Sequence, residues 1–318
     1  MSSFATRVWH LIVTQGILYP FGACMLYYPT FIFIDEWFIK KKGLAFGICW
    51  VGSGIAGVAF PLIAKYALSR FSFQVTMWAW AILMFILTGP FLPFVKRRLP
   101  LSTPSSSGSQ QIAPSFLSSR TFIILQFGNI LQSLGYFIPS IYLATYARSV
   151  VGEIGFGTTA PIVSMNAGMT LGFIVIGLLI DRCHVVNVLF TSAIGAALSV
   201  FMVWGISISL PPLCVFAMLY GTFAGSGPAA WPGIVQLLRN RDQAIPAGFV
   251  LSLLAAGRGV GSIACGPISE ALMKGGWTLT GRSKLGYGTE FGILIVFTGM
   301  TATFGALGFG ARKLGIIQ

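Results

Sequence analysis

Long uninterrupted apolar runs dominate this sequence and leave it few ways to fold. A helix needs about 20 residues to cross the roughly 30 Å hydrocarbon layer of a bilayer. Hydrophobic residues make up 55% of the chain and charged residues 8%, far below the roughly 25% charged residues of a soluble domain. The runs are continuous, whereas barrel strands alternate apolar and polar residues. The sequence predicts an all-α polytopic membrane helix bundle in a lipid bilayer, with nine transmembrane helices near 10–34, 43–67, 74–95, 119–147, 157–180, 185–208, 211–237, 245–273 and 288–311.

Lysine and arginine residues are distributed unevenly between the two sets of loops. When the loop with Lys40–Lys42 faces the cytoplasm, that side carries twelve basic residues, against seven on the other side and Arg258 within a helix. Cytoplasmic loops carry an excess of basic residues, so we expect an outer N-terminus and a cytoplasmic C-terminus. The net charge of +13 therefore indicates topology. A nucleic-acid partner would need basic residues gathered with exposed aromatics in a soluble domain, and none is predicted.

One segment interrupts the pattern of helices and divides the chain. Residues 96–115 begin with basic residues and continue in serine, proline, glycine and glutamine, a composition with little to bury. We predict a flexible cytoplasmic linker over 96–118, between a partial N-terminal bundle of three helices (1–95) and a C-terminal six-helix bundle (119–318). The runs 43–67 and 245–273 share a glycine-rich start and a late proline, the weak internal symmetry of transporters built from repeated halves. Three helices would then be missing from the first half.

Small and polar residues inside the runs carry the remaining information. Pairs such as Gly43-xxx-Gly47 predict close helix packing. Arg258 lies near the middle of its run, where a charge costs about 2.5–3.5 kcal/mol on insertion scales, so it either anchors an anionic substrate or fixes helix packing. Spacings of three and four place a polar stripe on one face of 119–147. The stripe lines either a cavity, which we favour, or a hydrogen-bonded interface, and it comprises Gln126, Asn129, Ser133, Tyr136 and Ser140.

The sequence IDRCH at 180–184 closes a predicted helix at the membrane surface. Asp181 and Arg182 either form a gate that pairs charges across the protein in one state, or mark a helix end beside a topogenic arginine. The five cysteines have neither metal-ligand spacing nor a disulfide framework. No nucleophile, base and orienting group occur together, so the sequence predicts no enzyme, no metal site and no cofactor.

Four segments resemble one family of membrane proteins. Residues 14–63, with WFIKKKGLAFG at their centre, resemble the fourth and fifth helices of the monocarboxylate-transporter-like branch of the major facilitator superfamily, especially its fungal members. GYFIPSIYLATYA (135–147) resembles the seventh helix of that branch, GLLIDRCHVVNVL (177–189) the end of the eighth, and GRGVGSIACGPISEAL (257–272) the eleventh. The resemblance implies a twelve-helix, major-facilitator type fold of which this chain begins at the fourth helix. It also implies a plasma-membrane location.

The resemblance has one departure that concerns substrate chemistry. Members of the branch commonly carry a Gly-Arg pair in the eighth helix, and that arginine is linked to the carboxylate substrate. Here Gly172 is followed by Phe173, which cannot pair with a carboxylate. This departure counts against an ordinary proton-linked monocarboxylate carrier.

Two functions are therefore weighed. The leading hypothesis is a membrane transporter that moves a small organic solute, with a monocarboxylate as one candidate and a co-transported proton, by alternating access. The alternative is a truncated, non-transporting membrane protein or an incomplete gene model of such a transporter, in which a protein partner would supply the missing helices. We assign the gate to Asp181 and Arg182. The candidate substrate-binding residues are Arg258, Asn129, Gln132, Tyr136, Tyr142 and Asn166.

Overall fold

The computed structural model describes residues 3, 5, 7–96, 114–240, 245–275 and 285–315, and this part of the chain is mainly helical. The predicted runs are confirmed, with their ends shifted by only a few residues. The chain is therefore an integral, multi-pass membrane protein. The nine helices of this described part that are long and apolar enough to cross a membrane are Val8–Trp37, Lys42–Arg70, Phe73–Phe94, Arg120–Ser149, Ala160–Arg182, Val185–Ile206, Leu210–Arg239, Ala247–Lys274 and Gly292–Lys313.

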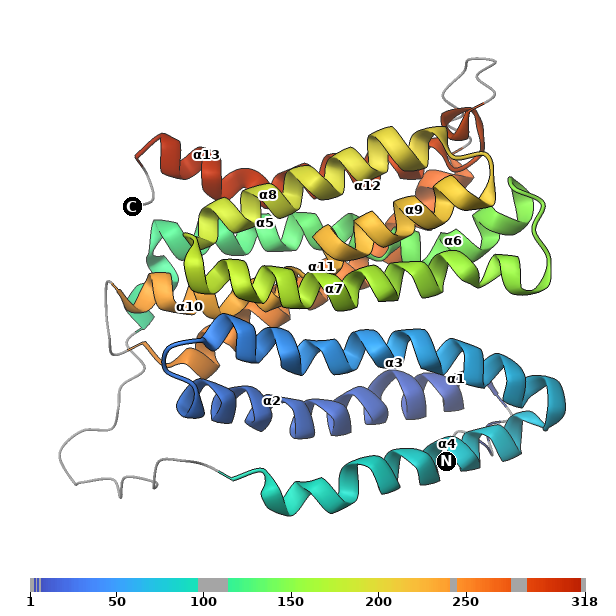
Figure 1. Ribbon diagram of the computed structural model, residues 1–318, viewed down its shortest axis with the longest axis horizontal. Helices are drawn as coiled ribbons and strands as arrows, with labels where there is room; N and C mark the ends of the chain where they lie inside the picture. The colour runs from blue at the N-terminus through green and yellow to red at the C-terminus, as the bar shows by residue number, and fades with distance from the viewer. Residues whose placement is uncertain are drawn as a thin grey trace. The chain divides into compact units, whose positions relative to one another are not determined.

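Several of these spans consist of more than one regular helix (Figure 1). The α-helices are α1 (Val8–Leu11), α2 (Tyr19–Trp37), α3 (Lys42–Arg70), α4 (Phe73–Thr88), α5 (Arg120–Tyr136), α6 (Ile138–Ser149), α7 (Ala160–Arg182), α8 (Val185–Leu198), α9 (Leu210–Tyr220), α10 (Trp231–Arg239), α11 (Ala247–Lys274), α12 (Gly292–Thr303) and α13 (Leu307–Lys313). The π-helical turns are Ile12–Leu18, Ser199–Val203 and Gly221–Gly225. The 3₁₀ turns within the spans are Gly89–Phe94, Trp204–Ile206, Gly227–Ala230 and Phe304–Ala306.

Local chemistry sets the ends and interruptions of these helices. Ser72 and Ser119 cap α4 and α5, since their hydroxyl oxygens accept hydrogen bonds from the amides of Val75 and Phe122. Proline cannot donate a backbone hydrogen bond, and Pro139 lies where α5 gives way to α6. The span Leu210–Arg239 is interrupted over a longer stretch than the span α5–α6, because a π-helical turn and a 3₁₀ turn separate α9 from α10.

The chain forms two compact units, which are described separately. One contains residues 1–40 and 59–109, and the other contains residues 41–58 and 110–318. The first part of α3, up to Val58, thus belongs with the helices that follow residue 110. The division into three helices, a linker and six helices stays a prediction. Residues 97–113 of the predicted linker lie outside the described residues.

The unit with α1, α2, the end of α3 and α4 is loosely packed. Phe31 is the buried residue of α2 and Thr76 that of α4. The unit has an aromatic contact between Phe60 and Trp80, whose ring centroids lie 4.7 Å apart. Most of its large apolar side chains are exposed, as expected for helices that face lipid or further protein.

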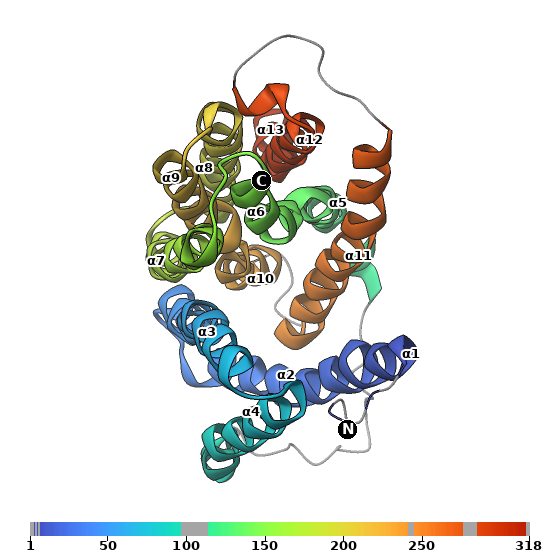
Figure 2. The same ribbon diagram turned by 90° about the vertical axis from the view of Figure 1, so that its right-hand side faces the viewer.

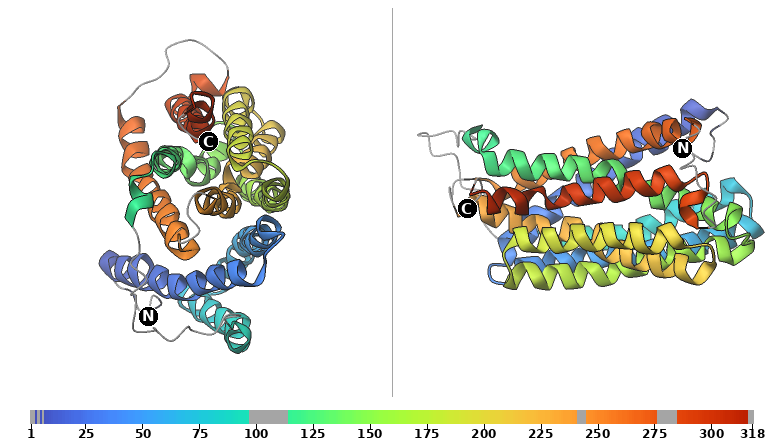
Figure 3. Two further views of the ribbon diagram at one scale, coloured as in Figure 1. Left: turned by 90° about the vertical axis from the view of Figure 1, so that its left-hand side faces the viewer. Right: turned by 90° about the horizontal axis from the view of Figure 1, so that it is seen from above.

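The second unit has a dense core around the span α5–α6. In the end-on view of Figure 2, the helices α7 to α12 surround this span, and Figure 3 shows the same ring from the opposite side. Its largest buried side chains include Trp204, Tyr146, Phe216 and Phe291. Trp204 stacks on Phe216 at a centroid distance of 4.9 Å, and the Tyr146 hydroxyl donates to the carbonyl of Ser207 at 2.6 Å. Close packing of this kind is the main attraction between helices in lipid.

Glycine lets two pairs of helices in this unit approach to backbone contact. On α3, Gly43 faces the carbonyl of Gly177 of α7, and Gly47 faces that of Phe173. On the other side of α7, Gly172 faces the backbone of Thr222. A Cβ atom at any of these glycines would overlap the facing backbone. The predicted role of the small-residue pairs in helix packing is therefore confirmed at α3 and α7.

Candidate functional site

Arg258 lies halfway along α11, half-buried, with its guanidinium group over an aromatic ring. The guanidinium carbon is 4.0 Å from the centroid of the Tyr136 ring of α5. Such a cation–π contact contributes about 0.5–2 kcal/mol, with the larger values at desolvated sites. Among the described residues no carboxylate pairs with Arg258. A guanidinium has five N–H donors, all of which point outwards in the plane of the group. The ring of Tyr136 lies against the face of the guanidinium and uses none of these donors, so the group can still bind an anion.

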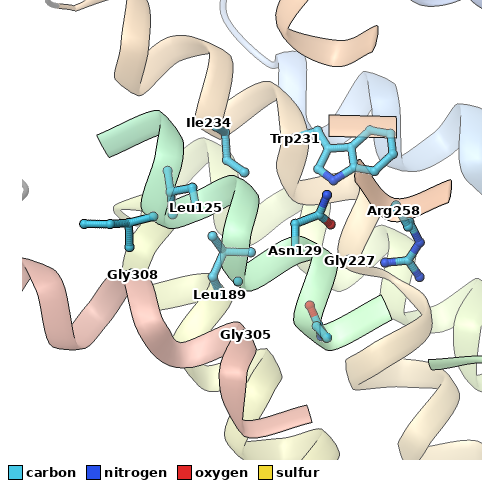
Figure 4. Close-up of a pocket in the computed structure, with 12 residues that line it drawn as sticks. Leu125, Asn129, Leu189, Gly227, Trp231, Ile234, Arg258, Gly305 and Gly308 are labelled. Carbon is cyan, nitrogen blue, oxygen red and sulfur yellow. The ribbon is translucent and has the colours of Figure 1, made fainter. Parts of the chain in front are cut away.

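A small cavity adjoins this guanidinium (Figure 4). Its volume is about 30 Å³, room for only one or two water molecules. Asn129, Gln132, Trp231 and Arg258 supply its polar and aromatic lining, and Figure 4 shows Asn129, Trp231 and Arg258 converging from three different helices. The remaining lining residues are apolar or glycine, namely Ile124, Leu125, Gly128, Leu189, Gly227, Ile234, Gly305 and Gly308.

The polar stripe of α5 serves two purposes. The side-chain amides of Gln126 and Asn129 donate to the carbonyls of Leu253 and Leu254 of α11, at 2.7 Å and 2.8 Å. Ser133 is fully buried and donates to the carbonyl of Asn129 at 2.6 Å. Gln126 and Ser133 therefore belong to a hydrogen-bonded interface between α5 and α11. Asn129 belongs to that interface and also lines the cavity.

Tyr142 and Asn166 do not line the cavity. The Tyr142 hydroxyl donates to Ser269 Oγ at 3.3 Å, which joins α6 to α11. The Asn166 side chain donates to the carbonyl of Ile162 at 2.9 Å, one turn earlier in α7, and lies against Gly57 of α3. The structure thus brings together four of the six predicted binding residues, and substrate binding by all six stays a prediction.

Asp181, at the end of α7, caps the N-terminus of α3. Its Oδ1 accepts a hydrogen bond from the amide of Gly43 at 2.8 Å, and its Oδ2 accepts one from the amide of Leu44 at 2.9 Å. The first amides of a helix have no partner within the helix, and they carry the positive end of its dipole. Arg182 is exposed and has no acidic partner within the described part of the chain. Asp181 therefore joins α7 to a helix end, and its role as a gate stays a prediction.

Trp231 is a lining residue that the sequence reasoning missed. Its ring meets that of Trp50 of α3 edge to face at 6.5 Å, and Trp50 stacks on Phe173 of α7 at 5.5 Å. The three rings therefore connect the cavity to the glycine-packed contact between α3 and α7. The sequence feature that could have indicated Trp231 is the run GSGPAAWPG at 225–233, which contains it. Clustered glycine and proline residues interrupt a helix.

The comparisons with known proteins agree with this architecture. No family model matches the chain. It is 29% identical over 280 residues to MFS transporter asaE of Aspergillus flavus, 30% over 241 residues to MFS-type transporter 1 of Ophiocordyceps sp., and 26% over 287 residues to monocarboxylate transporter 10 of Danio rerio. These matches cover 86%, 74% and 85% of this chain and 61%, 52% and 55% of the relatives.

The resemblance to major facilitator transporters, including a monocarboxylate transporter, is therefore confirmed over most of the chain. The chain spans between 52% and 61% of the length of these three relatives.

Proposed function

We propose that this chain acts in a membrane transporter that moves a small organic anion by alternating access. The relatives named as transporters support a transport function. The main structural support for this proposal is Arg258, a half-buried residue in the middle of a membrane span. Its guanidinium group lies over an aromatic ring and has no carboxylate partner in the described residues. Charged residues within membrane spans are rare and commonly mark substrate or ion pathways, which supports a functional role for Arg258.

The recognition chemistry follows from the groups around Arg258. Guanidinium pairs with a carboxylate through two parallel hydrogen bonds, and such a pair is strong where water is excluded. Asn129 and Gln132 add neutral amide groups, while the apolar walls would contact the body of the solute. An ionised monocarboxylate satisfies all three demands, and a proton that is moved together with it would compensate its charge across the membrane.

The mechanism requires the helices around the cavity to separate, because about 30 Å³ is too small for an organic acid. The contact between α3 and α7 is suited to such a movement, since backbone meets backbone across it. The Asp181 cap on α3 would hold this contact closed in one state and release it in another. The plasma membrane as location and the cytoplasm as the side of the C-terminus are parts of this proposal.

The proposal is tested by uptake of radiolabelled acetate, pyruvate and butyrate into cells that express the chain. Arg258→Ala should abolish uptake of every acid that the wild type moves, and Arg258→Lys should retain a fraction, because lysine keeps the charge without the planar fork. Arg148→Ala, an exposed position at the end of α6, is the matched control. Surface biotinylation measures expression of each variant.

Two results would contradict the proposal. One is wild-type uptake that Arg258→Ala leaves unchanged. The other is a wild-type chain that reaches the cell surface and moves none of the acids, which would favour the non-transporting alternative. Sequencing the transcript to its 5′ end distinguishes a short protein from part of a longer reading frame.

A further inference from the structure

A second cavity in the second unit is lined by residues from the end of α7, the start of α8 and the end of α10. Figure 1 shows these helices. The volume of the cavity is about 250 Å³, and it is separate from the cavity at Arg258. Polar side chains form much of its wall: Arg182 and His184 from the turn between α7 and α8, and Gln236 and Asn240 from α10 and its end. The cavity therefore offers hydrogen-bond donors at the end of three membrane helices.

The charges around this cavity favour an anion. Arg182 is exposed and has no acidic partner in the described residues. Asp181 is the acid in the lining, and both of its oxygens accept hydrogen bonds from the first amides of α3. A second cation lies close by, because Arg312 of α13 donates to Asn187 Oδ1 of α8 at 3.2 Å. The carboxylate is thus already satisfied, whereas the guanidinium of Arg182 has no acidic partner among the residues that the structure describes.

An exposed apolar stripe on α7 leads up to Arg182. Leu171, Val175 and Leu178 are 49%, 48% and 38% exposed, and their spacing of four and three residues continues to Arg182 four residues later. Residues at these spacings lie on one face of a helix. A molecule bound at Arg182 through a phosphate could therefore lay a hydrocarbon chain along the same face.

We propose that this cavity binds the phosphate headgroup of an anionic phospholipid, with Arg182 as the charged contact and with its acyl chain along Leu171, Val175 and Leu178. Gln236 and Asn240 supply neutral donors to the headgroup. Free phosphate shares the headgroup chemistry, but it gains nothing from the apolar stripe. Basic pockets between membrane helices are sites of this kind.

The test is native mass spectrometry of the purified chain in detergent. The probes are dioctanoyl phosphatidylglycerol, dioctanoyl phosphatidylcholine and inorganic phosphate, each added alone. We expect the anionic lipid to bind more tightly than the zwitterionic lipid, and inorganic phosphate to bind weakly. Arg182→Gln should weaken binding of phosphatidylglycerol about fivefold, the effect of one basic residue near a membrane surface. Arg148→Gln, at the end of α6, should leave it unchanged.

A second variant tests the site independently, in case Arg182→Gln does not fold. Gln236→Ala combined with Asn240→Ala keeps all charges and should weaken phosphatidylglycerol binding by a smaller factor. The proposal is overturned if Arg182→Gln and Arg148→Gln bind phosphatidylglycerol equally, or if both lipids bind equally well. Phosphate that binds as tightly as phosphatidylglycerol would also overturn it, since the site would then be one for a free anion.

Discussion

The guanidinium of Arg258 rests 4.0 Å above the ring of Tyr136, and this contact joins α11 to α5 inside the membrane. Two amides strengthen the same junction, because Gln126 and Asn129 donate to consecutive carbonyls of α11. Arg258 therefore rests on the ring of Tyr136, and within the described ranges no carboxylate occupies its N–H groups. A substrate would meet a cation that is already oriented.

The ring beneath Arg258 can be tested without removing the charge. Tyr136→Leu should raise the KM for the transported acid about tenfold, the equivalent of about 1.4 kcal/mol and within the range of a desolvated cation–π contact. Tyr136→Phe keeps the ring face and should behave like the wild type. Concentration-dependent uptake measures both. Equal KM values for the two variants would show that the ring does not orient Arg258.

Trp231 should limit the size of the solute. Trp231→Ala removes the indole from the wall of the cavity and should increase uptake of hexanoate relative to acetate, whereas Trp231→Phe should change this ratio less. Trp78→Ala, an exposed tryptophan of the other unit, is the control. The ratio of kcat/KM for the two acids decides the outcome, and an unchanged ratio in Trp231→Ala would count against this role.

The Asp181 cap should contribute measurably to stability. Asp181→Ala leaves the amides of Gly43 and Leu44 without their acceptors, and loss of a cap costs about 0.5–2 kcal/mol. Asp181→Asn keeps one acceptor oxygen, so its thermal unfolding temperature should lie between those of Asp181→Ala and the wild type. Glu270→Ala is the control, because its exposed pair with Lys274 contributes little. A melting temperature unaltered in Asp181→Ala would refute the stabilising role.

The glycines of α3 offer a matched pair within one helix. Gly47→Ala should destabilise the protein by about 1–3 kcal/mol, because the new methyl group overlaps the Phe173 carbonyl. Gly52→Ala meets open space and should be neutral or stabilising by up to about 1 kcal/mol, the difference in helix propensity. Thermal unfolding in detergent compares the two. Similar melting temperatures would mean that α3 can move away from α7 at no cost.

His184 should make stability depend on pH. Burial and then the neighbouring Arg312 lower the pKa of His184 below 6.5, and its neutral Nδ1 accepts a hydrogen bond from the amide of Val186 at 3.3 Å. Because the unfolded chain binds this proton more readily, the stabilisation is complete above the unfolded pKa of 6.5 and decreases as the pH falls below it. Protonation also removes the acceptor that caps α8.

The measurement is the change in melting temperature between about pH 7.5 and about pH 5.5, on either side of the ordinary histidine pKa. His184→Asn can still cap α8 but does not titrate, so its melting temperature should fall less than that of the wild type. His10→Asn controls for the other histidine. A wild-type decrease no larger than that of His184→Asn would exclude His184 as the source.

The helices were predictable because the thickness of the bilayer sets their length, and a continuous apolar run shows this directly. The interruption between α9 and α10 was not predicted, although glycine and proline mark it. In a membrane, neighbouring helices can satisfy the freed backbone groups, so composition alone does not show where a span breaks.

The candidate site was predictable in part. A charge within an apolar run identifies Arg258, and helical spacing identifies Asn129 and Tyr136. Tyr142 and Asn166 look equivalent in the sequence, but their hydrogen bonds to Ser269 and to the carbonyl of Ile162 depend on tertiary neighbours. The same holds for Asp181, whose partners at Gly43 and Leu44 lie 138 and 137 residues away.

The contact between α3 and α7 also has an entropic consequence. Glycine has no side chain, so at Gly43 and Gly47 closing this contact freezes no rotamers and opening it releases none, whereas burial of a long side chain costs up to about 2 kcal/mol of conformational entropy. Because backbone meets backbone at these glycines, this part of the contact can form and separate without repacking side chains, whereas the stack of Trp50 on Phe173 and the hydrogen bonds of Asp181 must form again at each closure. The conformational entropy lost on closing therefore falls on side chains such as Trp50, Phe173 and Asp181, and the glycines add nothing to it.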